Sequence, residues 1–427
     1  MKKRKLHYAW IILLGVILIR GFASGGINMT SGLFLEPVSE DIGVGIGTIS
    51  LYLSIMSVVT VIFLPIAGKI INKYDIRIIS IIGAFLQALS FVAFGFLTSV
   101  FGWYILAIPQ AIGAIFIATL MGPILINRWF VKNKGFIMGI QMAFVGLFGA
   151  VLEPVTAKLI SRNGWRYAYF IIGSITFVVV VIASILFIRN RPSDKKLSAL
   201  GAGDRTETKK QVSDDVVHIP ENIVLKSASF YLLLFFMIAI TGVGVFNQHI
   251  PTYGELLGFS INQTGEALSS SSIGTAIGSV AIGFISDRIG SLKTCYIMIG
   301  AGLAAVVAFL FGGSGIVIFF IASFLHGFAS AGIMVLAPIL TLSFYGNKDY
   351  EKIFSKISMG APIASILLIP FYGFIYDYTH SYFLVLLIIA FLLIFSTISI
   401  SLGWKKRCTL MNVQQGEKND MRKDRIR

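Results

Sequence analysis

A single arginine, Arg20, lies inside the first long apolar stretch of the chain, which begins near Tyr8. If this stretch is a helix that starts at a membrane surface, a rise of about 1.5 Å per residue places Arg20 ~18 Å deep, near the midplane. A charge there costs about 2.5–3.5 kcal/mol, so it is expected to face protein or a water-filled cavity. Because a guanidinium matches a carboxylate with two donors, we predict that Arg20 binds an acidic solute. A structural ion pair and snorkelling are the alternatives.

His326 and Gln110 occur at a similar depth in two other apolar stretches. An imidazole titrates near neutral pH, so His326 is a candidate for substrate binding and for proton coupling. The alternative for His326 is a packing residue whose ring is satisfied within the protein. Gln110 can hydrogen-bond a solute as donor and as acceptor.

Glu153 precedes Pro154 in the outer half of a fifth apolar stretch. A buried carboxyl group can exchange a proton, which makes Glu153 a proton-coupling candidate. The proline can open the helix at this point. The alternatives are a salt bridge to Arg20 or Lys158 and a position at the mouth of a pore.

Two polar clusters lie in the second half of the chain. The cluster Asn247-Gln248-His249 lies near the outer end of a seventh apolar stretch and is a candidate for lining the vestibule, with a wetted helix end as the alternative. Within it, Asn247 and His249 are the candidates for substrate binding. Ser269–Ser272 are expected to bond back to their own helix.

The stretches that carry these residues are predicted to be membrane-spanning helices. Hydrophobic residues make up 56% of the 427 residues and charged residues 13%, whereas soluble domains have about 25% charged residues. A span needs about 20 residues. Twelve stretches fit, at residues 8–34, 47–71, 77–98, 102–126, 135–160, 166–187, 230–253, 264–286, 294–312, 316–344, 353–376 and 382–402.

Several other classes of protein are excluded by the pattern. The apolar runs are long and do not alternate, which argues against a membrane β-barrel. The five histidines are scattered and the two cysteines are not spaced as ligands, so we expect no metal, no cofactor and no enzyme site. No Gly-x-x-x-x-Gly-Lys-(Ser/Thr) loop is present for an ATP-driven pump. The N-terminus imitates a secretion signal, but its long apolar run favours an uncleaved first helix.

Charge position predicts the orientation of the spans. With Met1 inside, all of the 35 Lys and Arg residues except Arg20, Lys158, Arg162 and Arg166 fall on the inside. This pattern accounts for the net charge of +15 without a nucleic-acid partner. The predicted units are a six-helix bundle at 1–188, a flexible cytoplasmic linker at 189–226, a second bundle at 227–404 and a disordered basic cytoplasmic tail at 405–427.

Two short turns repeat the pattern Gly-x-x-x-(Asn/Asp)-(Lys/Arg) at matching places in the two halves. Glycine lets two helices approach closely, and the acid or amide can cap a helix or pair across the seam. The repeat predicts a cytoplasmic gate, with a generic basic turn as the alternative. The gate residues are Gly68, Asn72, Lys73, Arg77, Gly283, Asp287, Arg288 and Gly290.

These turns resemble the Gly-x-Leu-x-Asp-Arg-x-Gly-Arg-Arg pattern of the major facilitator superfamily, although Asn72 and Asp75 depart from it in the first copy. Further stretches resemble its monocarboxylate and oxalate/formate branch: 34–38, 127–130, 134–139, 164–168 and 373–377. The resemblance covers nearly all of residues 8–402. It implies an all-α membrane protein with twelve helices in two bundles, cytoplasmic termini, and a cavity lined by the first, fourth, seventh and tenth helices.

The leading hypothesis is a secondary transporter in the cell membrane, working as a monomer on a small organic anion, with a proton as a further partner or with exchange. Better-known anion carriers of the family place an arginine in the eighth helix, and the oxalate type adds a lysine in the eleventh. The corresponding cores here carry no basic residue, so Arg20 would act alone from the opposite half. A drug or neutral-solute exporter and a non-transporting solute sensor are the alternatives.

Overall fold

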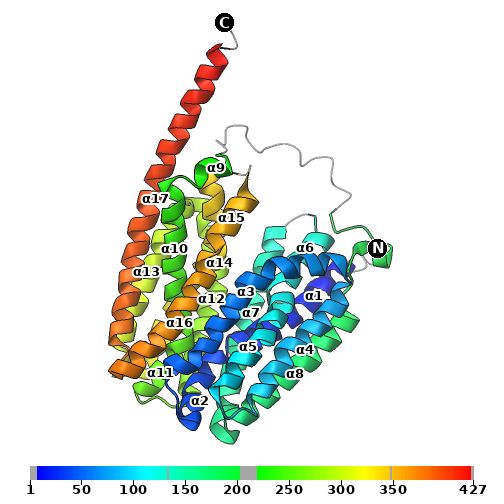
Figure 1. Cartoon of the computed structure of the whole chain (residues 1–427), viewed down its shortest axis with the longest axis vertical. Helices are drawn as coiled ribbons and strands as arrows, with labels where there is room; N and C mark the ends of the chain where they lie inside the picture. Colours follow the sequence, from blue (N-terminus) through cyan, green and yellow to red (C-terminus); the bar gives the residue numbers. More distant parts are fainter. Residues whose placement is uncertain (1–6, 132–133, 202–218, 347–348, 425–427) are drawn as a thin grey trace, which may run out of the picture.

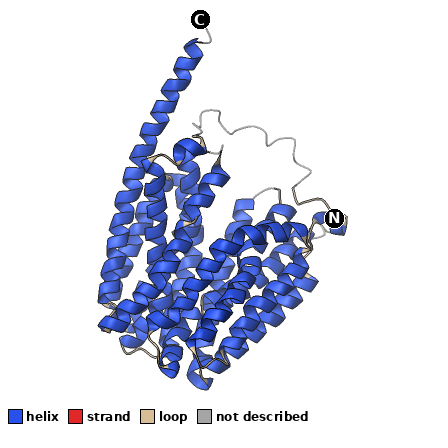
Figure 2. Cartoon of the chain, viewed as in Figure 1, coloured by secondary structure: helices blue, strands red, loops and turns tan. Residues whose placement is uncertain are grey.

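The computed structural model describes residues 7–131, 134–201, 219–346 and 349–424, excluding the side chains of residues 72, 134–135, 333–335, 351 and 408–424. The described residues form helices joined by short turns (Figure 2). Twelve helical stretches are long and apolar enough to cross a membrane, which confirms the predicted number.

The first six spans form one bundle. The first span is broken into α1 (Tyr8–Arg20), η1 (Gly21–Asn28), η2 (Ser31–Phe34) and α2 (Leu35–Ile42), and the fourth into α5 (Val100–Ala114), η3 (Ile115–Leu120) and α6 (Met121–Trp129). The others are α3 (Ile46–Lys73), α4 (Ile76–Phe94), α7 (Lys134–Asn163) and α8 (Trp165–Leu186).

The last six spans form the second bundle. The seventh span consists of α10 (Ala228–Gly244), η6 (Val245–His249) and α11 (Ile250–Leu256), and the eleventh of α15 (Tyr350–Ser358) and α16 (Gly360–Thr379). The others are α12 (Ile261–Ile289), α13 (Ser291–Leu310), η7 (Gly312–Ser314) with α14 (Ile316–Tyr345), and α17 (Phe383–Asp424).

The two bundles lie side by side, with both chain ends at the same end of the molecule (Figure 1). We call this end the terminal face, which carries the turns near residues 74, 130, 290 and 349, and we call the other end the opposite face. The bundles meet along two helix pairs, α3 with α16 and α7 with α12.

Two π-helical segments widen the first and fourth spans where they pass each other. In η1, Gly25 packs so closely that an added Cβ would lie 2.8 Å from the main-chain nitrogen of Gly149 on α7. A π-turn shifts the register of the helix and often marks a functional site. The segments η1 and η3 therefore allow close packing and redirect the side chains around them.

Both ends of the linker are more ordered than the sequence predicts. Leu200 exchanges main-chain hydrogen bonds with Trp129 and Val131, and Ile219 donates to the carbonyl of Tyr345 and is fully buried. The short helices η4 (Pro192–Lys195) and α9 (Glu221–Val224) lie near the two ends of the linker. Residues 202–218 of the predicted linker lie outside the described residues.

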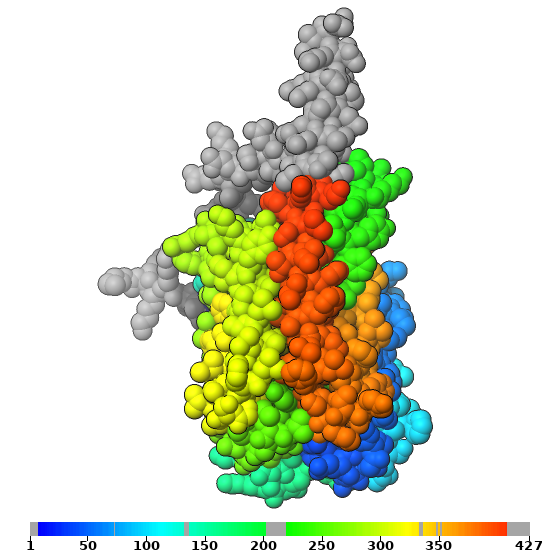
Figure 3. Space-filling view, turned by 90° about the vertical axis from the view of Figure 1, so that its left-hand side faces the viewer, coloured from blue at the N-terminus to red at the C-terminus, as the bar shows by residue number. Residues whose placement is uncertain are grey.

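The expectation of a disordered tail is wrong, because α17 continues as a helix to Asp424. Lys, Arg, Gln, Glu and Met, which are good helix formers, follow the span and carry the helix onward. Within the span, α17 packs on α10 and α13 (Figure 3). Its outer side carries an exposed apolar stripe suited to lipid, made by Phe383, Leu387, Phe391, Ile394, Ile398 and Leu402.

Candidate functional site

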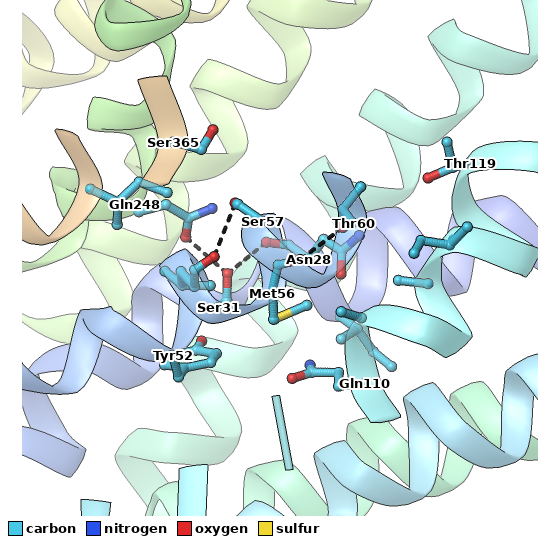
Figure 4. A pocket seen from close by; sticks show the side chains of 16 residues that line it. Asn28, Ser31, Tyr52, Met56, Ser57, Thr60, Gln110, Thr119, Gln248 and Ser365 are labelled. Carbon is cyan, nitrogen blue, oxygen red and sulfur yellow. Dashed lines mark hydrogen bonds between the residues drawn. The ribbon is translucent and has the colours of Figure 1, made fainter. Parts of the chain in front are cut away.

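A polar cavity of about 210 Å³ lies between the two bundles (Figure 4). It is smaller than the roughly 300–1,000 Å³ of pockets for drug-sized ligands, so it suits a small solute. The first, second, fourth, seventh and eleventh spans line it, whereas the tenth, which the resemblance implied, does not. The lining is uncharged, and its polar members are Asn28, Ser31, Tyr52, Ser57, Thr60, Gln110, Thr119, Gln248 and Ser365.

The cavity is closed toward the opposite face. Ser31 and Tyr52 are buried there, and the Ser31 hydroxyl bonds Oε1 of Gln248 across the seam at 2.9 Å. Thr119, which is nearer the terminal face, is exposed. Solvent therefore reaches the cavity from the terminal face.

Arg20 ends α1 and is buried, and it does not belong to the cavity lining. Its Nε donates to the carbonyl oxygen of Ala118 at 2.7 Å, and its Nη1 lies 3.7 Å from the sulfur of Met142. Gly122 leaves room for the side chain, because an added Cβ would lie 2.9 Å from Cδ of Arg20. Among the described residues no carboxylate forms an ion pair with Arg20. Ala118 directly precedes Thr119, so the guanidinium is bonded to η3, a segment that also contributes to the cavity lining.

Glu153 is fully buried at the seam between α7 and α12. Its Oε1 accepts a hydrogen bond of 2.8 Å from Ser272, and its Oε2 is buried without a partner among the described residues. The alternative of a salt bridge to Arg20 or Lys158 is wrong, since neither pairs with it in the described part of the chain. Because Ser272 belongs to the other bundle, this bond breaks if the bundles separate here.

The expectation that Ser269–Ser272 bond to their own helix is wrong. Successive residues point around a helix in steps of about 100°, so the four hydroxyls reach different neighbours. Their acceptors are, in order, the Ala150 oxygen at 2.7 Å, the Phe320 oxygen at 3.0 Å, Asn247 Oδ1 at 2.7 Å and Glu153 Oε1 at 2.8 Å.

Both predicted site histidines lie inside the second bundle and outside the cavity lining. His326 has Nε2 3.0 Å from the carbonyl oxygen of Val243. His249 has Nδ1 3.2 Å from the hydroxyl of Tyr382 and Nε2 2.9 Å from the carbonyl oxygen of Ile369. His249 is fully buried, so the alternative of a wetted helix end is wrong. Both nitrogens of His249 have partners, as in a packing residue, whereas Nδ1 of His326 is buried without a partner among the described residues.

Of the predicted cluster at residues 247–249, only the middle residue lines the cavity. Asn247 accepts from Ser271, and His249 faces the bundle interior, but Gln248 between them lines the cavity. The predicted Gln110 also lines it. The sequence analysis missed Asn28 and Ser31, although their short spacing after Arg20 in the same apolar span was a usable signal.

The predicted gate residues of the first turn interact locally. Asp75 caps α4 by accepting from the main-chain nitrogen of Arg77, and the two side chains form an ion pair of 2.7 Å. The Arg77 hydrogen bond lowers the pKa of Asp75 from its ordinary value. Lys73 lies over the ring of Tyr74 at 5.4 Å, and the side chain of Asn72 lies outside the described residues.

The second turn also shows interactions within itself. Arg288 stacks on Phe284 at 4.1 Å, Asp287 is exposed, and Gly290 has a φ of 88°, which favours glycine. A Cβ added at Gly68 or Gly283 would meet no atom within 4 Å. The two glycines therefore face open space in this conformation.

The bundles are held together at the opposite face. Asp377 on α16 accepts hydrogen bonds from the main-chain nitrogens of Ile46 and Gly47, at the start of α3, at 2.7 and 2.8 Å. The helices touch closely, because a Cβ on Gly373 would lie 2.7 Å from Cα of Gly47. One bundle thus caps a helix of the other.

The model of the Major Facilitator Superfamily matches residues 16–315 and 232–407. Relatives include the MFS-type transporter YhjX of Escherichia coli (22% identical, covering 84% of this chain and 86% of its length). The oxalate:formate antiporter of Oxalobacter formigenes is 24% identical over 71% of this chain and 68% of its own. Monocarboxylate transporter 12 of Rattus norvegicus is 22% identical over 83% and 76%. These relatives are transporters and not enzymes.

Two solved structures are similar in fold. A bacterial homologue of the lysosomal transporter Spinster, in an inward-facing and unoccupied conformation, has a TM-score of 0.67 at 13% identity and covers 96% of this chain and 98% of that one. A point mutant of the nucleoside transporter NupG has a TM-score of 0.68 at 12% identity, with 94% and 100% covered.

Proposed function

Because the chain belongs to the Major Facilitator Superfamily, we propose that it carries a small monocarboxylate-type organic anion across the cell membrane by alternating access. The relatives named for monocarboxylates and for oxalate and formate support this class of solute. The size of the cavity fits it too. We expect the monomer to be the working unit.

The environment of Arg20 is the observation that supports an anionic solute. Its guanidinium is buried, has no ion-pair partner among the described residues, and lies against the segment that forms one wall of the cavity. An uncompensated buried charge is expensive. A bound anion would offset that charge, so Arg20 favours anionic over neutral solutes.

In this proposal the terminal face, which carries the basic loops, lies in the cytoplasm. The conformation is then inward-facing, with the cavity reached from the cytoplasm and the outer side closed by Asp377. The two basic turns, with half-buried glycines at 68 and 283, form the cytoplasmic gate that closes in the outward-facing state.

Glu153 is the proton-coupling site in this proposal. A carboxyl group between two moving bundles can hold a proton while buried and release it when the seam opens to water. The unpaired Oε2 supports this role. His326 is the second candidate, although its ring bonds Val243 within the second bundle.

The test is uptake of radiolabelled formate, acetate and oxalate by proteoliposomes, with and without an inward proton gradient. Arg20→Ala is expected to lower uptake at least tenfold, and Arg20→Lys to retain part of it. Arg162→Ala, which removes an exposed arginine, is the control. Wild-type uptake by Arg20→Ala would remove Arg20 from transport.

The uncharged lining favours one second candidate, an exporter of a neutral solute. Transport of neutral compounds, with no transport of any carboxylate, would support this candidate.

A further inference from the structure

We propose that three carboxamides, Asn28, Gln110 and Gln248, hold the carboxylate of the solute directly, while Arg20 acts on it from behind the cavity wall. This inference rests on the proposed function, because it concerns how an anion is recognised. A carboxylate only accepts hydrogen bonds, so its site needs donors that the protein has not already used.

Asn28 presents its amide nitrogen to the cavity. Nε2 of Gln87 donates to the carbonyl oxygen of Ala23 at 3.0 Å, which fixes the orientation of the Gln87 amide. The same nitrogen donates to Oδ1 of Asn28 at 3.2 Å. The oxygen of Asn28 is therefore occupied, and its Nδ2 has no partner among the described residues.

Gln248 faces the cavity from the other bundle. Its Oε1 lies 2.9 Å from the hydroxyl of Ser31, which shares its one hydrogen between this oxygen and the carbonyl oxygen of Asn28 at 2.7 Å. Its Nε2 has no partner in the described part of the chain, and the side chain lies beside the cavity (Figure 4).

Gln110 has no hydrogen bond from either amide atom to a described residue. The side chain is only 3% exposed and belongs to the cavity lining. Buried carboxamides are nearly always bonded, so an unbonded one at the wall of a pocket indicates a missing partner. A bound carboxylate would accept from Nε2, whereas Oε1, which is buried without a partner among the described residues, needs a donor instead.

Four of the five serine and threonine hydroxyls in the cavity lining already donate hydrogen bonds, with Thr119 as the exception among the described residues. Ser57, Thr60 and Ser365 donate to main-chain oxygens one turn back in their own helices, at 3.0, 2.8 and 3.1 Å. The Nε of Arg20 is likewise engaged by Ala118. These groups already have acceptors, whereas the three amide nitrogens are free among the described residues to donate to a carboxylate.

The three amide donors come from both bundles, so a bound anion would contact each bundle. Asn28 and Gln110 belong to the first bundle and Gln248 to the second. A carboxylate bound by all three would bridge the seam, so its binding favours conformations in which the bundles approach. The site also discriminates by donor geometry, since the primary amide of the same shape presents an N–H₂ group where the carboxylate has an oxygen.

The test uses purified full-length protein and compares binding of acetate with binding of its neutral isostere acetamide. Asn28→Asp, Gln110→Glu and Gln248→Glu keep size and the acceptor oxygens toward Gln87 and Ser31, but replace the donor with a negative oxygen. Gln263→Glu is the matched control, because Gln263 caps α12 far from the cavity and glutamate serves equally in that capping box. Gln110→Met, which is uncharged, tests the same position if the acidic variant fails to fold.

Each cavity variant is expected to weaken acetate binding at least tenfold and to leave acetamide binding within about threefold, with the control unchanged. Wild-type acetate affinity in all folded variants would overturn the carboxamide site while leaving the transport proposal intact. If the wild-type protein binds and transports no carboxylate, the proposed function fails and this inference fails with it. Transport of acetate that depends on Arg20 but on none of the three amides would assign direct recognition to Arg20.

Discussion

The carboxylate of Asp377 and the main-chain nitrogen of Ile46 are 2.7 Å apart although they belong to different bundles. The second carboxylate oxygen takes the neighbouring nitrogen of Gly47. The first N–H groups of a helix have no partner within the helix, and an acid at this position also stabilises the helix dipole. The helix α3 therefore obtains its cap only while the opposite face is closed.

Asp377→Ala is expected to shift the protein toward states open at the opposite face. Loss of a capping side chain costs about 0.5–2 kcal/mol, which corresponds to a shift of about 2- to 30-fold in the equilibrium. The readout is the distance between spin labels on Ser99→Cys and Ser314→Cys, which lie in exposed turns of the two bundles at this face.

The matched control is Asp41→Ala. Asp41 forms an ion pair of 2.7 Å with Arg166 at the same face, but both residues belong to the first bundle. Equal distance changes in the two variants would argue against a latch between bundles.

Gly283→Leu is expected to leave the present conformation intact and to block closure of the terminal face. The position is open here, yet a gate that closes by close helix contact has no room for a leucine side chain. Transport should fall at least tenfold. Spin labels at Tyr74→Cys and Lys293→Cys should keep the long separation that they have when the terminal face is open. Gly300→Leu, at another open helical glycine away from the turn, serves as the comparison. Normal transport by Gly283→Leu would refute the gate.

Glu153→Gln is expected to remove the response of uptake to a proton gradient while exchange of solute continues. The glutamine oxygen still accepts from Ser272, so the seam keeps its hydrogen bond. Initial uptake is measured from pH 5.5 to 8. Glu266→Gln, an exposed change on α12, is the control. A pH profile identical to that of the wild type would leave His326 as the remaining candidate.

Asp75→Ala is expected to lower thermal stability near neutral pH by about 1 kcal/mol through loss of the α4 cap. The folded pKa of Asp75 lies below its unfolded value near 3.9, because Arg77 stabilises the carboxylate. This contribution is fully present above the unfolded pKa and is lost as the pH falls through the folded pKa. The stability difference between wild type and variant should therefore shrink below about pH 4. A difference that grows on acidification would contradict the ion pair.

The fold was largely predictable because lipid imposes long apolar helices, and twelve such stretches stand out in the sequence. Gln110 was predictable for the same reason, as a polar side chain in an apolar run. The ends of helices were harder, since α17 continues through residues that no longer need lipid.

The cavity contacts could not be assigned from the sequence alone. Gln248 and His249 are adjacent, but only the fold shows that one faces the seam and the other the interior of the second bundle. The roles of Ser269–Ser272 depend on which helices surround α12. Periodicity gives the direction of a side chain around its helix, and not the neighbour that it meets.

The neutral lining of the cavity affects how readily the protein changes conformation when no solute is bound. Reorientation without cargo requires the vacated site to lose its water, and stripping water from fixed ions is far more costly than stripping it from amides. Amides line the cavity and Arg20 is already buried beside Ala118. We therefore expect the protein without solute to return readily to its other conformation. Net flux down a gradient, with no counter-solute on the far side, would follow.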